Sequence, residues 1–427
     1  MIKTRITGKH VRESLDFTRR IIDAFGPRLC GTEACEKSAR VIHGELKKRC
    51  VSSGIEEFDL RPNAFLGFVR VSTVVYIISS LFLFFEYLVP AVLGYTFTVV
   101  MILSQFVLYQ QVFDFLYKKK KGYNVYGIIE PRGEVKQQII LGSHHDSARV
   151  FNYFTYFPRL YRIRLILGFG PIVLSFFILW AWIIMAAATG HKPFFADWLR
   201  YGAVASFVFT GQLFFFIGKN GTPGAGDNLI STAISITLAG IFGVAKNNKK
   251  PLLEHTRLVI LSFDAEESGL RGARAYVKKH REELLSVPTR VFNMDSIYDA
   301  DKIKLLISDI NGLRMLSRKM AGECVDVATR LGYRPKFFRF LFGAGGTDAA
   351  EFAKIGVEAT TLIAMPISVE RDAVVYHTPA DTVENIEPGA VEAVLKIAAA
   401  YIAEKDAQCD DRIKPVEKKK RKIQALR

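Results

Sequence analysis

Cysteine is scarce in this chain of 427 residues, which holds five cysteines and no Cys-x-x-Cys pair. A sparse, odd-numbered set argues against a disulfide framework and indicates free thiols in a reducing compartment. The first twenty residues also lack the apolar stretch that a secretory signal peptide needs, so we expect none. The length is sufficient for a full hydrophobic core, which excludes a disulfide-stapled miniprotein.

Acidic residues are outnumbered, since 42 Asp and Glu face 58 Lys and Arg, for a formal net charge of +16. Such a charge fits either nucleic-acid binding or the flanks of membrane segments. The mean hydropathy is nevertheless slightly positive, at +0.17. Apolar blocks must therefore alternate with charged ones, which favours a membrane protein, and we expect no nucleic-acid partner.

Four uncharged apolar runs lie within the chain, at residues 71–85, 87–113, 165–190 and 201–218. A bilayer core requires about 20 apolar residues in a helix. The first two runs read as a hairpin broken near Glu86 and Pro90, with its first helix starting near Phe68. We predict four membrane spans in two hairpins, and the aromatic-rich runs argue against buried helices of a soluble core.

Basic residues flank these runs unequally. One side carries nine of them, at Arg70, 118–121, Arg159, Arg162, Arg164 and Lys219. The connecting loops carry only Lys192 and Arg200. By the positive-inside rule the first side, which also holds the rest of the chain, is expected to face the cytoplasm.

The spans interrupt a single soluble unit twice. We expect the parts to be a soluble segment 1–67, hairpin 68–117, soluble segment 118–158, hairpin 159–218, soluble segment 219–408 and tail 409–427. From Arg412 on, the tail has eight basic residues against Glu417 alone, which predicts a disordered segment drawn to the membrane surface.

The soluble segments alternate strand and helix patterns. Short apolar runs predict strands at 138–141, 258–263, 291–293, 303–307 and 360–364. Helical spacing marks the segments between several of them. The expected fold class is α/β, with a mixed, mostly parallel sheet flanked by helices and interrupted by the two transmembrane hairpins. In such sheets ligands bind at the carboxyl ends of the strands.

Acidic and histidine residues gather at those strand ends. One predicted strand delivers His144 and Asp146 in an H-x-D unit, and another is followed directly by Glu266 and Glu267. Further candidates are Asp227 in a Gly-rich turn that opens a helix, Asp295 after a strand, and His377 near the C-terminus. Adjacent carboxylates repel one another, and a bound divalent cation relieves that repulsion.

Five of these residues are candidate metal ligands: His144, Asp227, Glu267, Asp295 and His377. Two nitrogen donors with several oxygens fit Zn²⁺ better than Mg²⁺, and a shared carboxylate would allow a two-metal site. Glu266 is left beside a ligand, where it can take a proton from an activated water and pass it to a leaving amine.

In this order the motifs GSHHDS, PGAGDN, DAEESGLRGARAY, NMD, GGTDAAEF and YHTPADT resemble metallopeptidase family twenty-eight. That family holds co-catalytic di-zinc aminopeptidases, glutamate carboxypeptidase II-type enzymes and glutaminyl cyclases. The resemblance covers nearly all of the soluble segments and neither hairpin.

The resemblance implies a role for each candidate. Asp227 would bridge two zinc ions, with His144 and Asp295 completing one site and Glu267 and His377 the other. Glu266 would be the general acid/base, and Asp146 would support the metal cluster from behind. Co²⁺ or Mn²⁺ are possible substitutes for zinc. Thr347, Asp348 and Tyr376 are expected to bind substrate, although Thr-Asp-Ala stands at 347–349 where the family often has Ser-Asp-His.

The expected function is therefore that of a membrane-bound zinc exopeptidase, most simply an aminopeptidase acting on peptides. Two alternatives stay open at this point. A carboxypeptidase of the same family would need a basic clamp, such as Arg339 or Arg371, and a glutaminyl cyclase-like acyltransferase would hold a single zinc. A metal-free scaffold or a transporter fits the intact ligand set less well.

Expected partners are a peptide substrate, the lipid bilayer and a second copy of the chain. Because Asp227 closely follows the last predicted span, we also hypothesise that the substrates are peptides at the membrane.

Overall fold

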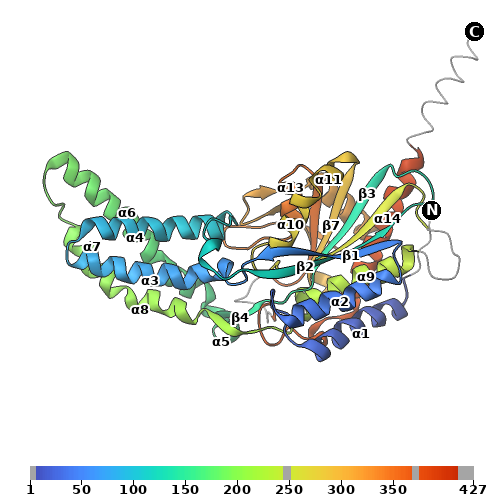
Figure 1. Cartoon of the computed structure of the whole chain (residues 1–427), viewed down its shortest axis with the longest axis horizontal. Coiled ribbons are helices and arrows are strands. Elements are labelled where there is room, and N and C mark those ends of the chain that lie inside the picture. Colours follow the sequence, from blue (N-terminus) through green and yellow to red (C-terminus); the bar gives the residue numbers. More distant parts are fainter. Residues whose placement is uncertain (1–5, 244–251, 368–374, 412–427) are drawn as a thin grey trace, which may run out of the picture.

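The computed structural model describes residues 6–243, 252–367 and 375–411, and the predicted tail lies outside this part from residue 412 on. Its centre is a nine-stranded mixed sheet (Figure 1). The strand order is β1-β2-β6-β3-β7-β11-β8-β10, with β9 paired to β8. The bounds are β1 Ser52–Leu60, β2 Lys120–Ile129, β3 Gln137–His144, β6 Thr256–Phe263, β7 Thr289–Ile297, β8 Ile303–Asp309, β9 Arg314–Met315, β10 Lys336–Arg339 and β11 Glu358–Ala364.

The centre of the sheet is parallel, since β6, β3, β7 and β11 run in one direction, and antiparallel pairs lie towards both edges. Every residue of β3 and of β7 is buried, as expected for strands covered on both faces. The predicted fold class is thus confirmed, and the five predicted strand cores lie in β3, β6, β7, β8 and β11. The pattern missed β2 because its first residues, KKGYN, are polar and read as a loop.

Helices cover both faces of the sheet (Figure 1). The larger apolar cluster packs α1, α2, α9, α12 and α14 together, and a second cluster packs α10, α11 and α13 against the sheet. Their bounds are α1 Gly8–Phe25, α2 Glu33–Lys47, α9 Ile230–Phe242, α10 Arg271–Lys279, α11 Arg281–Ser286, α12 Arg318–Arg330, α13 Ala349–Ala353 and α14 Pro388–Asp411. Two short turns join this part, η6 Ala300–Lys302 and η7 Val383–Asn385.

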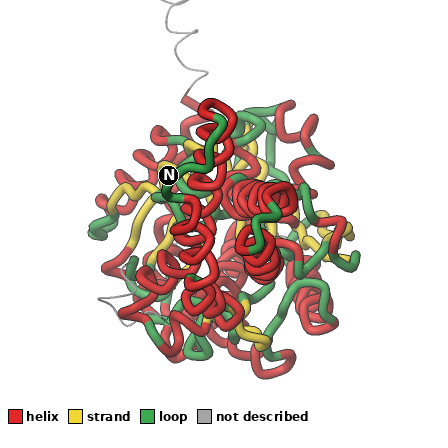
Figure 2. Tube along the Cα trace, turned by 90° about the vertical axis from the view of Figure 1, so that its left-hand side faces the viewer, coloured by secondary structure: helices red, strands yellow, loops and turns green. Residues whose placement is uncertain are grey.

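A helical bundle extends away from one end of the sheet, and Figure 2 looks onto its free end. It has its own apolar cluster, which includes buried Tyr76, Tyr95 and Trp182. The helices are α3 Ala64–Phe84, α4 Leu88–Ile102, α5 Asn152–Tyr156, α6 Tyr161–Thr189, α7 Ala196–Ala205 and α8 Phe207–Thr210. The shorter turns are η1 Leu103–Val107, η2 Asp114–Leu116, η3 Pro158–Leu160 and η4 Gly211–Phe215.

Among the described residues, four helices are long and apolar enough to cross a membrane: Ala64–Phe84, Leu88–Val107, Pro158–Thr189 and Ala225–Phe242. The first three correspond to the first three predicted spans. The first helix starts at Ala64 rather than near Phe68, because the chain turns at Pro62 and Asn63 directly after β1. The fourth helix is 89% buried and packs against the sheet, so it is a core helix of the soluble unit.

The predicted fourth span, 201–218, is not one continuous α-helix. The chain there forms α7, α8 and the 3₁₀ turn η4, and then enters a short strand, β5 Ile217–Gly221. The α-helix is interrupted at Ser206, whose hydroxyl donates to the carbonyl of Ala203 at 2.7 Å and lies 2.9 Å from the hydroxyl of Tyr76. These segments still pack within the bundle, through Leu199, Leu213 and Phe216.

Both hairpins leave and re-enter the sheet domain between neighbouring antiparallel strands. Leu60, at the end of β1, pairs with Lys120, at the start of β2, and the first hairpin lies between them. The second lies between β5 and β4 Arg149–Phe151, which form a separate two-stranded sheet. Each hairpin is therefore an enlarged turn.

Candidate metal centre

Three neighbouring strands bring acidic and histidine residues to one edge of the sheet. His144 is the last residue of β3, Asp295 lies near the carboxyl end of β7, and Glu266 and Glu267 follow β6. Because β3 pairs in parallel with both β6 and β7, these carboxyl ends lie together. The sequence-based placement of the ligands at this edge agrees with the structure.

Asp227 reaches the same place from the turn η5 Ala225–Leu229, which leads into α9. The turn lies tightly against the rest of the site, since a Cβ atom added at Gly226 would lie 2.1 Å from the ring of Tyr298. This close approach explains why the sequence has glycine there. His377 comes from the loop before α14, and both residues are buried.

The carboxylate of Asp227 stands between the two histidines. Its Oδ1 lies 3.4 Å from Nε2 of His144, and its Oδ2 lies 3.2 Å from Nε2 of His377. On one side His144 Nε2 is 3.8 Å from an oxygen of Asp295. On the other, His377 Nε2 is 3.2 Å from Oε2 of Glu267. The five predicted ligands thus form two half-sites that share Asp227.

Glu266 lies beside the first half-site, with Oε2 3.8 Å from Nε2 of His144. Donor atoms of His144, Glu266 and Asp295 lie within 4.8 Å of one another, as do those of His144, Asp227 and Glu267. Each set is compact enough for one cation. The structure therefore places Glu266 next to the predicted ligands.

Several donor atoms of this centre lack a hydrogen-bond partner among the described residues. They are Nε2 of His144, Oδ2 of Asp227, Oε1 of Glu267 and both ring nitrogens of His377. Buried polar atoms are rarely left unpaired, because each costs roughly 1–3 kcal/mol when unsatisfied. Imidazole nitrogens and carboxylate oxygens are zinc ligands, so the residues present fit bound divalent cations.

The charges of the centre also favour a bound cation. Burial raises the pKa of Glu267 and of Asp295, and the negative charge of Asp227 raises both further. Burial and the charges of Asp295 and Glu267 likewise raise the pKa of Glu266. Burial opposes a charge on His377, yet Glu267 and Asp227 outweigh it and raise its pKa. A bound cation would offset the negative charge of these buried acids.

Asp146 supports the centre from behind. Its two oxygens accept the backbone N–H groups of Glu266 and Glu267, each at 3.2 Å, and Oδ1 lies 3.3 Å from Nδ1 of His144. A carboxylate on the second nitrogen of a ligating imidazole fixes the ring and its tautomer. Asp146 therefore orients three of the predicted residues.

Two further supporting residues had no role in the sequence-based prediction. The carboxylate of Asp381 accepts the N–H of Gly226 at 2.8 Å and that of Asp227 at 3.4 Å. The buried guanidinium of Arg28 donates to the carbonyls of His145 and Gly224, at 2.9 and 2.8 Å. They fix the two loops that carry His144 and Asp227; Asp381 belongs to the YHTPADT motif, but the motif does not show which backbone groups it binds.

The predicted substrate-binding residues differ in their surroundings. Both carboxylate oxygens of Asp348 are buried and lack a partner among the described residues. The ring of Tyr376 stacks on that of His377, with centroids 3.9 Å apart. The hydroxyl of Thr347 is already engaged, since it donates to Asp309 at 2.6 Å.

Segments at the bases of the two hairpins contact the centre or residues close to it, which the sequence did not predict. Phe151, in β4, donates its backbone N–H to the carbonyl of His377 at 2.9 Å, and its ring lies edge-on to that imidazole at 4.4 Å. The other hairpin holds Asp114, which forms a 3.0 Å ion pair with buried Arg271, just beyond Glu267. Only the folded chain brings these segments together.

Part of this chain, including most of the centre, matches a known protein family. Residues 210–402 match the family described as peptidase family M28. Aminopeptidase YwaD of Bacillus subtilis (strain 168) is 26% identical over 187 residues, which span 43% of this chain and 38% of that protein. The matched part is thus well under half of that relative's length.

Solved structures share the fold over almost the whole chain. BSAP, a zinc aminopeptidase from Bacillus subtilis, superimposes with a TM-score of 0.54 at 14% identity, covering 92% of this chain and 94% of its own. A glutaminyl cyclase from an Acidobacteriales bacterium gives 0.55 at 14% identity, covering 96% and 98%. These similarities establish the fold. The family match holds Asp227, Glu266, Glu267, Asp295 and His377, and the predicted resemblance to this family is confirmed over residues 210–402.

Proposed function

We propose that this protein is a membrane-bound, zinc-dependent aminopeptidase with two metal ions. One observation carries the proposal: the two oxygens of Asp227 face two different histidines, at 3.4 and 3.2 Å. A carboxylate so placed is suited to bridge two cations. His144 and Asp295 would hold one ion, and Glu267 and His377 the other. The purely nitrogen and oxygen donor set fits zinc, with Co²⁺ or Mn²⁺ as substitutes.

When bound, two such ions activate a water and polarise the scissile carbonyl. Glu266 would act as the general acid/base. Its Oε2 is 3.8 Å from the ligand His144, and its raised pKa suits it to take a proton from the attacking water and deliver it to the leaving amine. Asp146 holds Glu266 and Glu267 through their backbone N–H groups, so the base and a ligand keep a fixed relation.

Asp348 favours an aminopeptidase over a carboxypeptidase. A buried carboxylate without a partner would be stabilised by a cation, and the α-ammonium of a free N-terminus is one. A carboxypeptidase would instead need a basic clamp. Arg339 lies exposed on β10, and Arg371 lies outside the described residues. We propose that Asp348 receives the substrate amine.

A glutaminyl cyclase-like reaction on a single zinc is the second candidate, because solved glutaminyl cyclases share this fold. The paired half-sites count against it. With both His144 and His377 facing Asp227, the chain offers ligands for two ions rather than one.

The bundle is proposed to anchor the enzyme in a membrane with the peptidase domain in the cytoplasm. Large apolar side chains face outward on α6, where Ile166, Leu174, Phe177 and Ile184 are each at least 60% exposed. At the free end, the few basic residues are neutralised. Lys192 pairs with Glu86 at 2.7 Å, and Arg200 pairs with Asp197 at 2.9 Å. The spans are flanked by nine Lys and Arg residues at the peptidase end and by Lys192 and Arg200 at the free end, and this count supports the cytoplasmic orientation.

Peptides at the membrane surface are the proposed substrates. The support is that the base of each hairpin lies at or close to the centre: Phe151, which precedes the second hairpin, packs on His377, and Asp114 in the first hairpin pairs with Arg271. A form with both hairpins shortened that cleaved membrane-bound and free peptides equally well would count against this proposal.

The deciding experiment compares wild type with Glu266→Ala in detergent, on aminoacyl-p-nitroanilides and N-blocked peptides, with zinc measured on the same samples. Cleavage of free N-termini only, lost in Glu266→Ala while about two zinc ions remain, is the expected result. One zinc per chain without hydrolysis would favour the cyclase reading. No bound metal would overturn both.

A further inference from the structure

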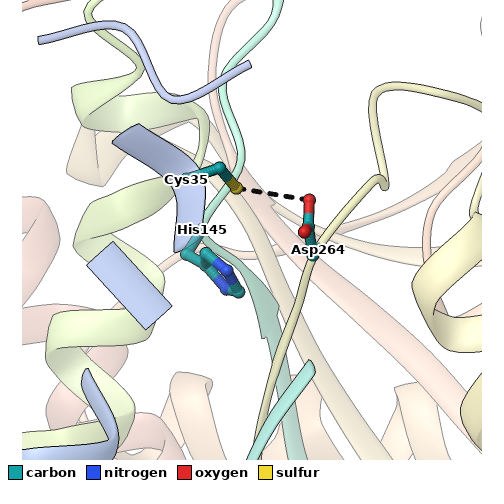
Figure 3. A group of neighbouring side chains, drawn as sticks. All are labelled: Cys35, His145 and Asp264. Atoms are coloured by element: carbon teal, nitrogen blue, oxygen red, sulfur yellow. Dashed lines mark hydrogen bonds between the residues drawn. The ribbon is translucent and has the colours of Figure 1, made fainter. Parts of the chain in front are cut away.

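We propose that Cys35, His145 and Asp264 form a separate metal site, which binds one zinc-class cation apart from the catalytic centre. The three residues come from different parts of the chain. Cys35 lies in the first turn of α2, His145 directly follows β3, and Asp264 directly follows β6 (Figure 3). Each is next to or near a residue of the catalytic centre, but none belongs to it.

The donor atoms of the three residues converge. One nitrogen, one sulfur and one carboxylate oxygen lie within 4.8 Å of one another. The thiol of Cys35 donates to Oδ1 of Asp264 at 3.2 Å, and Figure 3 shows the imidazole of His145 just below this pair. Ligand atoms of one zinc ion are roughly 3–4 Å apart, given bonds of ~2.0–2.3 Å. Side-chain shifts of about 1 Å would therefore bring all three into contact with one ion.

The imidazole of His145 supplies an independent indication. Its Nδ1 lies 2.9 Å from the hydroxyl of Ser262, but its Nε2 is buried and has no partner among the described residues. In the tautomer whose Nδ1–H donates to Ser262, Nε2 presents a free lone pair to the cluster, as a metal-ligating imidazole does.

The surroundings suit a closed structural site. All three side chains are buried, with exposed fractions of 1%, 0% and 0% for Cys35, His145 and Asp264. Thiolate, imidazole and carboxylate are all zinc ligands. Binding would release the thiol proton of Cys35 to solvent, and the charges of thiolate and carboxylate would neutralise the cation in this buried position. The carboxylate is held from behind, because Oδ2 of Asp264 accepts the N–H of Tyr123 at 2.9 Å.

The two sites differ in their donor atoms, so a spectroscopic test can tell them apart. The catalytic centre contributes only nitrogen and oxygen donors, whereas the proposed site contributes sulfur. Protein stripped of metal and reloaded with Co²⁺ alone should therefore show a thiolate-to-cobalt charge-transfer band in the near ultraviolet. Wild type should bind three equivalents of Co²⁺.

Variants assign the band to residues. Cys35→Ser should abolish it and lower the bound cobalt by one equivalent, and His145→Gln should weaken or remove it. Two buried thiols serve as matched controls: Cys30→Ser, whose sulfur lies 2.8 Å from the hydroxyl of Ser268, and Cys324→Ser in α12 should both keep the band. Asp227→Asn should lose catalytic cobalt yet retain the band, so failure of the proposed function and failure of this site are distinguishable.

Wild-type protein that binds cobalt without any thiolate band would overturn the proposal, whatever the variants do. So would a band that survives Cys35→Ser or disappears in Cys30→Ser. The test on wild-type protein needs no variant. The proposal can therefore be contradicted even if Cys35→Ser fails to fold.

Discussion

The metal centre and the membrane bundle bury polar groups of opposite kinds. In the bundle they are neutral hydroxyls that bond to one another: the hydroxyl of Tyr76 lies 3.0 Å from that of Ser175, and Ser80 lies 2.7 Å from Tyr95. In the centre they are carboxylates and imidazoles, several of which lack partners among the described residues. A hydroxyl stays neutral even where it lacks a partner, as those of Ser72 and Thr96 do in the bundle, whereas a set of buried acids requires a compensating positive charge. This contrast favours an anchor over a transport path in the bundle.

The largest effect is expected for Asp227→Asn. Loss of one carboxylate charge between His144 and His377 should remove metal from both half-sites. Activity should then fall by more than the ~10²–10⁴-fold expected for loss of a general base. Metal analysis and hydrolysis assays on one sample measure both. Retention of two metal ions would contradict the bridging role.

The contact between the two regions should be nearly as sensitive. Asp114→Ala leaves the buried guanidinium of Arg271 without its 3.0 Å ion pair, at an expected cost of about 3–5 kcal/mol in unfolding free energy. Thermal unfolding in detergent would record it. The double variant Asp114→Leu with Arg271→Met is the control and should recover most of the loss. Equal stability of wild type and Asp114→Ala would show that the hairpin and the peptidase domain are uncoupled.

A smaller effect is expected for Asp381→Asn. The substituted amide can accept only one of the N–H groups of Gly226 and Asp227, so the turn carrying Asp227 should loosen. Metal affinity is expected to fall by ~10–100-fold, as for other groups that orient ligands. Competition with a chelator measures this affinity directly. An unchanged affinity with a lower melting temperature would assign Asp381 a merely structural role.

The smallest effect is expected within the bundle. Tyr76→Phe removes the hydrogen bonds to Ser175 and Ser206, each worth about 0.6 kcal/mol in a membrane protein. The melting temperature should drop slightly, while metal content and turnover stay at wild-type values. A loss of metal in this variant would show that the packing of the bundle and metal binding in the centre are not independent.

Much of this organisation was predictable from the sequence. Buried parallel strands such as β3 and β7 are largely apolar, and His144, Glu267 and Asp295 lie at or just after the carboxyl ends of such strands, so the strand pattern indicated where these ligands lie. The first three long apolar helices were equally clear. The segment 201–218 was predicted as one span, and hydropathy does not register the interruption of the α-helix at Ser206, whose hydroxyl donates to the carbonyl of Ala203 and lies 2.9 Å from that of Tyr76.

The supporting contacts were not predictable, for a physical reason. Arg28 and Asp381 act through backbone groups of residues more than a hundred positions away, and such contacts leave no local periodicity. The same holds for Phe151, whose position in an apolar stretch gives no sign that its ring packs on His377. The proximity of His145 to Cys35 and Asp264 likewise follows from the fold alone, and no sequence pattern indicates it.

The places where the hairpins join the sheet make the anchor an exchangeable module. Leu60 and Lys120 already face one another across β1 and β2, and β4 and β5 close the second junction in the same way. A tight turn grafted at either junction would span the gap without displacing the strands. The helical bundle can therefore be added, removed or replaced in such a chain without displacing the strands that position Asp227 and the other predicted ligands.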